Sequence, residues 1–236
     1  DGGAIRGTNL FHSFWDFNVL DGRGAYFSNP IGIENILSRV TGSNPSHILG
    51  RLGVLGNANL FLLNPNGIVF GANARLDIPG SLTATTASSI QLGQTGLFSA
   101  TAPQQSTLLS MQPGALFLNA VASQPATIVS QGNLATGKDL TLAASHLTLS
   151  GQLRAGGNLT LQAADTLTIR DSATVPFVAS AGGQLWVQGD RQVSIFALNH
   201  PNSGLFAGGN LTLRSANSIG GDAHFWAGGN FRIEQL

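Results

Sequence analysis

Cysteine is absent from this sequence, and charged side chains are scarce. Without cysteine the chain has neither a disulfide framework nor a thiolate metal site. Ordinary soluble domains carry about 25% charged residues. Here the share is 9%, and 11 basic residues balance 11 acidic ones. The chain therefore lacks the basic surface that binds nucleic acid or anionic lipid, and we expect no nucleic-acid partner.

Strong helix formers are also scarce, because glutamate and lysine occur only as Glu34, Glu234 and Lys138. Amphipathic surface helices thus lack their usual residues. No apolar run approaches the roughly 18 residues of a membrane span, so we expect no stable membrane insertion. The only methionine is Met111 and no signal peptide begins at Asp1, which predicts a processed or incomplete piece of a longer protein.

What is abundant favours β-structure. The chain has 31 glycines and many Thr, Val, Ile, Leu, Ser and Asn residues, a mixture typical of short strands joined by tight turns. Hydrophobic residues make up 42% of the 236 residues, which suffices for one sizeable core or an elongated repeat array. The composition predicts an all-β chain.

A degenerate repeat fills the C-terminal half. Five similar stretches, "GKDLTL", "GGNLTL", "GGQLWV", "GGNLTL" and "GGNFRI", begin at Gly137, Gly156, Gly182, Gly208 and Gly228. Their irregular spacing excludes a strict short repeat but matches the coils of a β-solenoid with loops of variable length.

Alternation within each repeat predicts how the coils pack. Leu159 and Leu161 point to one face of a strand and Thr160 points to the other. One coil cannot bury its apolar face alone, so coils stack, with glycines at the corners where a Cβ has no room. One repeat position is polar in every coil and predicts a ladder along the stack, formed by Asp139, Asn158, Gln184, Asn210 and Asn230.

The N-terminal part follows the same pattern with strands every six to eight residues, roughly one side of a three-sided coil. Residues 91–126 are rich in Gln, Ser, Thr and Pro and predict loops or an excursion. Residues 175–181 and 199–204 read as insertions that lengthen two coils. Asn64, Pro65, Asn66 and Gly67 stand between two strands, and Asn-Pro followed by Asn-Gly is a strong turn signal. A solenoid corner is the default interpretation.

Three N-terminal segments carry a resemblance: "RGTNLFHSFWDF", "ENILSRVTGSNPSHILGRL" and "ANLFLLNPNGIVFGANARLDIPGSLTATT". Together, over residues 3–87, they resemble the secretion domain of two-partner secretion exoproteins, the filamentous haemagglutinin family. The rest resembles the degenerate repeats of cyanobacterial members. The resemblance implies a right-handed, single-stranded parallel β-helix with three-sided coils and loop insertions. It divides the chain into a secretion domain, 1–96, whose N-terminal cap is missing, and continuing repeats, 97–236.

The resemblance also implies a partner, a location and a motif. The partner is an outer-membrane TpsB-type barrel transporter with periplasmic domains, and the product is secreted or displayed on the surface of a Gram-negative bacterium. The family's secretion motif is matched by Asn64, Pro65, Asn66, Gly67 and Ile68. An earlier motif is half matched by Asn29 and Pro30. Whether the partner contacts Asn64 and Asn66, or needs only the coil that they close, stays open.

Other candidate residues have a simple structural interpretation. His12 lies between aromatics and is expected to be a packed, hydrogen-bonded histidine. The remaining histidines lack metal-ligand spacing, so neither a metal nor a cofactor is expected. Trp15 and Trp186 fall at strand positions and are expected to pack, whereas Trp226 is undecided.

The chain has no recognised catalytic motif, and we expect no enzyme. The enzymatic alternative is a polysaccharide lyase or hydrolase of β-helix fold. It would need paired carboxylates, for which Asp165 with Asp171, or Asp190 with Asp222, are the candidates across neighbouring coils. A purely structural filament segment is the other alternative. The preferred interpretation is a secreted, haemagglutinin-like adhesin with host or neighbouring-cell glycans as candidate ligands.

Overall fold

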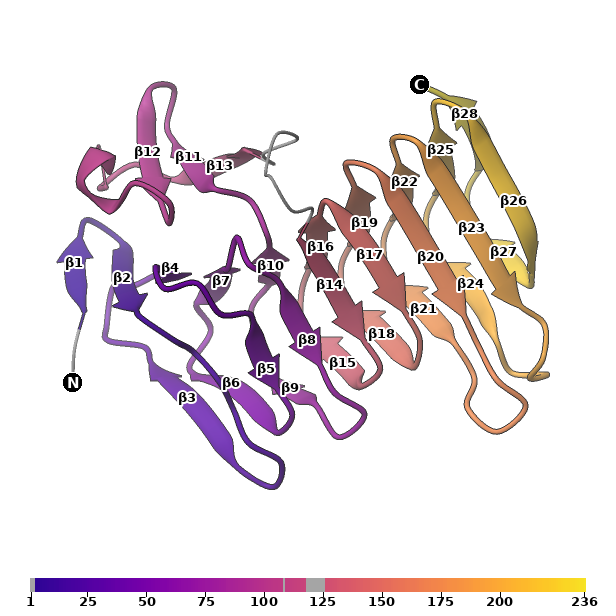
Figure 1. Ribbon diagram of the computed structural model, residues 1–236, viewed down its shortest axis with the longest axis horizontal. Helices are drawn as coiled ribbons and strands as arrows, with labels where there is room; N and C mark the ends of the chain where they lie inside the picture. Colours follow the sequence, from indigo (N-terminus) through magenta and orange to yellow (C-terminus); the bar gives the residue numbers. More distant parts are fainter. Residues whose placement is uncertain (1–2, 108, 118–125) are drawn as a thin grey trace.

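The computed structural model describes residues 3–107, 109–117 and 126–236. Its strands form three parallel sheets that the chain visits in turn, so the molecule is an elongated parallel β-helix (Figure 1). The expected all-β fold class is confirmed. We number the coils from the N-terminus and call the sheets first, second and third in the order in which each coil enters them.

The first sheet has ten strands: β1 (Ala4–Arg6), β2 (Asn9–Phe14), β4 (Asn35–Val40), β7 (Asn59–Leu63), β10 (Leu82–Thr85), β16 (Leu140–Ala144), β19 (Leu159–Ala163), β22 (Leu185–Gly189), β25 (Leu211–Ser215) and β28 (Phe231–Gln235). The second sheet has seven: β5 (Ser46–Ile48), β8 (Ile68–Phe70), β14 (Thr127–Ser130), β17 (His146–Leu149), β20 (Thr166–Arg170), β23 (Gln192–Ala197) and β26 (Ser218–Ala223). The third has eight: β3 (Gly24–Ser28), β6 (Arg51–Leu55), β9 (Arg75–Asp77), β15 (Asn133–Thr136), β18 (Gln152–Ala155), β21 (Val178–Ala181), β24 (Gly204–Ala207) and β27 (Phe225–Ala227). Within these three sheets, as far as the structure describes them, β1 is the only strand that pairs antiparallel, with β2.

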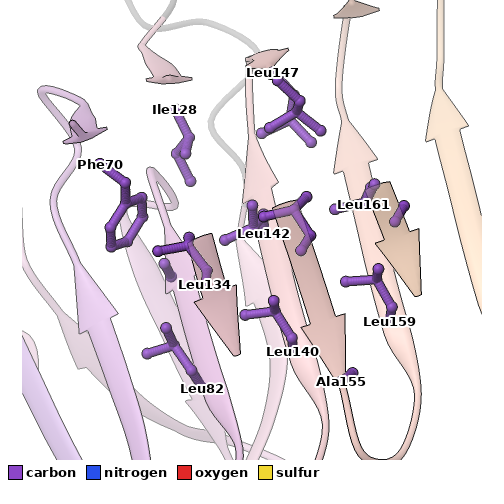
Figure 2. Close-up of a cluster of buried hydrophobic side chains, with 14 of the residues drawn as sticks. Phe70, Leu82, Ile128, Leu134, Leu140, Leu142, Leu147, Ala155, Leu159 and Leu161 are labelled. Atoms are coloured by element: carbon purple, nitrogen blue, oxygen red, sulfur yellow. The ribbon is translucent and has the colours of Figure 1, made fainter. Parts of the chain in front are cut away.

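Leucines at matching positions of successive coils form the core. Leu140, Leu159, Leu185 and Leu211 lie in register along the first sheet, and each is at most 1% exposed. Figure 2 shows side chains of this cluster, Leu140 and Leu159 among them, pointing into the interior. Burial of one such side chain contributes about 2 kcal/mol. The alternation predicted for β19 is confirmed, because Thr160 between its two buried leucines stays half-exposed.

Glycines stack where the third sheet turns into the first. A Cβ added to Gly156, Gly182 or Gly208 would collide with the carbonyl oxygen of the glycine one coil earlier. The predicted reason for these glycines, that successive turns pack too closely for a Cβ, is confirmed.

The predicted polar ladder lies beside these glycines. Asp139 Oδ1 accepts a hydrogen bond from the backbone N–H of Asn158 at 2.7 Å, and Asn158 Oδ1 accepts one from Gln184 N–H at 2.8 Å. The ladder also reaches the first coil, which was not predicted. There Asn35 Nδ2 donates to Asn9 Oδ1 at 3.0 Å, and Asn59 Nδ2 donates to Asn35 Oδ1 at 3.1 Å.

The chain leaves the solenoid in the fourth coil, between β10 and β14, as the sequence predicted for residues 91–126. This excursion forms a small antiparallel sheet of β11 (Ser89–Leu92), β12 (Gly96–Ser99) and β13 (Pro113–Phe117), with the 3₁₀ helix η1 (Pro103–Gln105). It lies against the outer face of the first three coils (Figure 1). Residues 118–125 of the predicted segment lie outside the described residues.

Three outward-facing residues of the first sheet are buried by this excursion. Phe11, Leu37 and Leu63 pack against Ile90 and Phe98, and all five are at most 6% exposed. Hydrogen bonds add to the contact. Asn9 Nδ2 donates to the carbonyl oxygens of Leu109 at 2.9 Å and Met111 at 2.7 Å.

The two coil insertions lie at one corner, between the second and third sheets. They span residues 171–177 and 198–203. The predicted bounds of the first, 175–181, were wrong because residues 178–181 are strand β21, whose Ala179 is fully buried. Asp171 joins the two loops, since it accepts hydrogen bonds from Asn199 Nδ2 at 2.8 Å and Ser203 Oγ at 2.7 Å.

Candidate functional site

The motif at residues 64–68 forms the turn between β7 and β8, in the third coil. Asn64 is fully buried. Its Nδ2 donates to the carbonyl oxygen of Asn44 at 3.0 Å and to Ser46 Oγ at 2.9 Å, both in the second coil. The side chain that opens the motif therefore ties one coil to the preceding one.

The same side chain also shapes its own turn. Asn64 Oδ1 accepts from the backbone N–H of Asn66 at 3.0 Å and from Asn66 Nδ2 at 3.1 Å. Asn66 is exposed, and its Nδ2 lies 2.8 Å from the carbonyl oxygen of Gly42. Gly67 N–H donates to Asn64 O at 3.1 Å, which closes the turn. Residues 64–67 therefore form a corner of the solenoid between β7 and β8, as predicted.

The residues on both sides of the excursion contact this turn. The backbone N–H of Asn64 donates to the carbonyl oxygen of Thr85, the last residue of β10 before the chain departs, at 3.0 Å. Gly67 has φ +120°, and a Cβ there would lie 3.1 Å from the carbonyl oxygen of Thr127, where the chain re-enters the solenoid. Glycine is needed at this position for both reasons.

A second Asn-Pro step supports the turn from one coil earlier, and sequence reasoning missed it. Asn44 and Pro45 precede β5, whose Ser46 pairs in register with Ile68 of the motif. Asn44 Nδ2 in turn donates to Asp16 Oδ1 at 3.0 Å. The signal that could have found this step is the recurrence of Asn-Pro after 20 residues, about one coil.

The half-matched motif, Asn29 and Pro30, lies at a different corner, between the third and first sheets. In the orientation that satisfies both ends of its amide, Asn29 Nδ2 donates to Ile33 O at 3.0 Å, and Oδ1 accepts from the N–H groups of Asn57 and Ala58 at 3.1 Å. Asn29 therefore ties its turn to the following coil, as Asn64 ties its turn to the preceding one. The structure does not bring the two motifs to a common corner.

The expectations for the tryptophans need one correction. Trp15 was expected to pack at a strand position, but β2 ends at Phe14 and Trp15 is 72% exposed. Trp186 does lie in β22, half-buried, and its Nε1 donates to Gln188 Oε1 at 3.2 Å. Trp226, left open, is 56% exposed.

His12 packs between Phe14 and Phe27, with ring centroids 5.9 and 5.2 Å away. Its packing was predicted correctly. The expected hydrogen bond was wrong for Nε2, which is buried without a partner among the described residues. Burial lowers the pKa of His12, and the imidazole is favoured in its neutral form.

Neither carboxylate pair of the enzymatic alternative comes together. Asp165 and Asp171 flank the two ends of β20, and five extended residues separate them by roughly 16 Å or more. Asp222 pairs in register with Phe196 near the end of β23, whereas Asp190 precedes the start of that strand. The prediction that these residues could meet across coils was wrong because each pair spans a strand's length.

The acidic side chains have other partners. Hydrogen bonds from Thr166 and Arg191 lower the pKa of Asp165, and Arg191 Nε lies 2.7 Å from its carboxylate. Among the residues that the structure describes, no three His, Asp or Glu side chains are grouped to hold a metal ion. Across the same residues no helix has the length and apolar character to cross a membrane.

Comparison with known proteins gives one family match over nearly the whole chain. The model of the TPS secretion domain matches residues 1–233. "Toxin CdiA" of Escherichia coli is 38% identical over 102 residues, and "tRNA nuclease CdiA" of Escherichia coli strain NC101 is 36% identical over 112 residues. Each match covers 43% of this chain but only 3% of the relative's length.

A solved structure shares the fold. The crystal structure of the HMW1 secretion domain from Haemophilus influenzae aligns with a TM-score of 0.51 and 17% sequence identity. The alignment covers 98% of this chain and 73% of that one. At this identity the likeness concerns the fold alone, and it supports a β-helix over the whole described chain.

Proposed function

The chain belongs to the TPS secretion domain family, and from this membership we propose that it directs the export of a longer exoprotein by two-partner secretion. The proposed partner is an outer-membrane TpsB-type barrel transporter with periplasmic domains. The proposed destination is the medium or the cell surface of a Gram-negative bacterium. The repeats of residues 97–236 support a narrower proposal, a cyanobacterial-type member.

We propose that residues 64–68 serve export by closing a coil. The observation that carries this is the complete burial of Asn64, with Asn44 and Ser46 of the preceding coil as its partners. A partner cannot touch such a side chain once the coil has formed. Asn29 and Pro30 have the same proposed role at their own corner, where Asn29 joins two coils.

The division at residue 96 is part of the same proposal. Residue 96 opens β12 of the excursion, which packs on the first three coils. Residues 97–236 would then complete the excursion and, from β14 on, continue the solenoid that those coils begin.

The experiment measures export and stability of the same variants. The full chain, with a signal peptide in front, is produced with a barrel partner, and its amount in the medium is compared with the urea midpoint of the purified protein. Asn64→Ala leaves the buried Ser46 hydroxyl and the partly buried Asn44 carbonyl without this partner, a cost of about 1–3 kcal/mol. We expect export to fall with stability. Asn202→Ala is the matched control, since Asn202 is exposed and its side chain makes no hydrogen bond to the described residues.

Asn66→Ala separates the two roles of the motif. Asn66 is exposed, and its loss removes hydrogen bonds to Gly42 and Asn64 at the surface. Under the coil-closing role, export by Asn66→Ala falls only as far as stability does. Loss of export at an unchanged urea midpoint would instead mean that the barrel partner recognises Asn66 in the extended, unfolded chain.

We further propose that the exported β-helix takes part in adhesion, with host or neighbouring-cell glycans as ligands. The exposed indole of Trp15 supports this role, because a solvent-facing tryptophan can stack on a sugar ring. The experiment is binding of the purified protein to a glycan array, and a chain that binds no glycan would instead fit the structural filament segment.

A further inference from the structure

A hollow of about 330 Å³ lies beside the 64–68 turn. Three segments line it: the corner that follows β2 with Trp15, the loop of residues 41–43, and the turn itself with Pro65 and Asn66. The excursion closes it through Thr101 and Pro103. We propose that this hollow, which we call the Trp15 hollow, binds a neutral saccharide.

Trp15 has the placement that such a ligand requires. The backbone N–H of Gly42 donates to the carbonyl oxygen of Trp15 at 3.0 Å, which fixes the base of the side chain. A Cβ at Gly42 would collide with that oxygen and would lie 3.3 Å from indole Cε2, so the ring lies against a glycine. The residue nevertheless stays 72% exposed. A large aromatic held in place and left open to solvent marks a binding surface more than a packing residue.

Polar groups with spare hydrogen-bonding capacity line the Trp15 hollow together with the indole. Asn66 Nδ2 donates a hydrogen bond to Gly42 O, which fixes the orientation of the side-chain amide. The Oδ1 atom of the same amide accepts no hydrogen bond from the described residues. The Ser43 hydroxyl likewise makes none within the described chain. Thr101 Oγ1 makes one long hydrogen bond, 3.5 Å to Ser99 Oγ, and can make further ones. An amide oxygen and two hydroxyls beside one apolar ring are the groups that position a sugar: the ring stacks and the hydroxyl groups are hydrogen-bonded.

The lining is also uncharged. Every residue of the Trp15 hollow is neutral, and the neighbouring carboxylate of Asp16 already accepts from Asn44 Nδ2 at 3.0 Å. No cation is there to compensate an anionic group, so the ligand is a neutral sugar. The volume lies at the lower end for small-molecule sites, with room for roughly one or two rings. A proline-rich peptide, the competing occupant, usually docks in a groove with several aromatic residues.

This inference rests on the proposed adhesive role and gives it one site, but it does not depend on export. The experiment therefore uses purified, folded protein with 5-fluorotryptophan at its three tryptophans. The ¹⁹F NMR spectrum is recorded during titration with lactose, maltotetraose and cellotetraose up to about 10 mM, which would nearly saturate a site with a Kd of about 1 mM. We expect a saturable shift of the Trp15 resonance only.

Two variants make the test specific. Trp15→Ala should weaken binding by about tenfold or more, with an unchanged urea midpoint because the side chain is exposed. Trp226→Ala, the control, removes another exposed tryptophan outside the hollow and should bind normally. Three results would overturn the site: no shift at Trp15, a saturable shift at Trp226 instead, or a proline-rich peptide that shifts Trp15 where no sugar does.

The glycan array separates failure of the site from failure of adhesion. If Trp15→Ala keeps the binding of the unaltered chain, adhesion stands and the Trp15 hollow is wrong. If the chains bind charged glycans alone, adhesion stands and the Trp15 hollow is wrong. If neither chain binds any glycan, both proposals fail.

Discussion

The side-chain nitrogen of Asn64 lies 2.9 Å from the hydroxyl oxygen of Ser46, and both residues are fully buried. The bond joins the third coil to the second at the corner where the first sheet turns into the second sheet. Because the two residues are 18 positions apart, local turn preference cannot supply this contact. The corner is stable only when two coils are stacked.

We therefore predict that Asn64 and Ser46 are energetically coupled. Ser46→Ala should cost about 1 kcal/mol and Asn64→Ala about 1–3 kcal/mol. The double variant should cost less than the sum, by about 0.5 kcal/mol or more. Urea unfolding of the four proteins measures the coupling. Strict additivity would show that the bond contributes nothing.

Gly67→Ala should destabilise the protein by about 1–3 kcal/mol, because φ +120° is costly for alanine and a Cβ would press on the carbonyl oxygen of Thr127. Gly220→Ala is the control, since a Cβ there has nothing within 4 Å and no positive φ is present. Its unfolding free energy should change by no more than about 0.5 kcal/mol. Equal effects of the two substitutions would contradict the role given to Gly67.

Phe98→Ala should release the excursion from the first three coils. Phe98 is 1% exposed, and its ring centroid lies 4.9 Å from that of Phe11. The guanidinium carbon of Arg39 lies over the same ring, 4.6 Å from its centroid. We expect a loss of about 3–5 kcal/mol from these contacts. Amide hydrogen exchange should speed up in β11 and β12 and in the strands they cover, while β19 and β22 stay protected. Phe196→Ala, at a residue 48% exposed, should cause no comparable change.

Acid should loosen the two inserted loops through Asp171. Desolvation raises the pKa of this carboxyl, but hydrogen bonds from Ser203, Asn199 and the backbone N–H of His200 outweigh it, so the pKa lies below its usual value. A carboxylate with a lowered folded pKa stabilises the protein above its unfolded pKa, about 3.9, and that contribution is lost as pH falls through the folded pKa.

The Asp171→Asn variant should therefore be less stable than the unaltered protein at pH 7 and lose less stability below about pH 4. Urea midpoints at several pH values measure both slopes. Asp222→Asn is the control, because Asp222 is exposed and accepts no hydrogen bond from the described residues. A parallel pH dependence in Asp171→Asn and the unaltered protein would refute the assignment.

Much of the fold could be predicted because its signals are local. Alternation in strands such as β19, the glycines at the coil corners and the Asn-Pro-Asn-Gly turn all depend on neighbouring residues. The partners of the turn could not be predicted in this way. Asn44 and Ser46 meet Asn64 only through the register of stacked coils, and coil lengths vary along the chain.

Two further features depend on where strands stop and what covers them. Trp15 continues an aromatic-rich run, yet β2 ends one residue earlier and leaves the indole in solvent. Phe11, Leu37 and Leu63 add apolar residues to the outward faces of their strands, and runs of this kind indicate burial on both faces. That signal was present in the sequence, but it does not say which segment supplies the cover.

The side-chain amide of Asn9 donates hydrogen bonds to the carbonyl oxygens of Leu109 and Met111, which lie 100 and 102 positions later in the chain. When a chain emerges from a pore or a ribosome with its N-terminal side first, the coil that contains Asn9 cannot form these hydrogen bonds until Leu109 and Met111 have also emerged. Fully extended, the intervening stretch would measure roughly 330 Å. The contact thus sets an order of folding: the coil that contains Asn9 reaches its final packing only after Met111 has emerged.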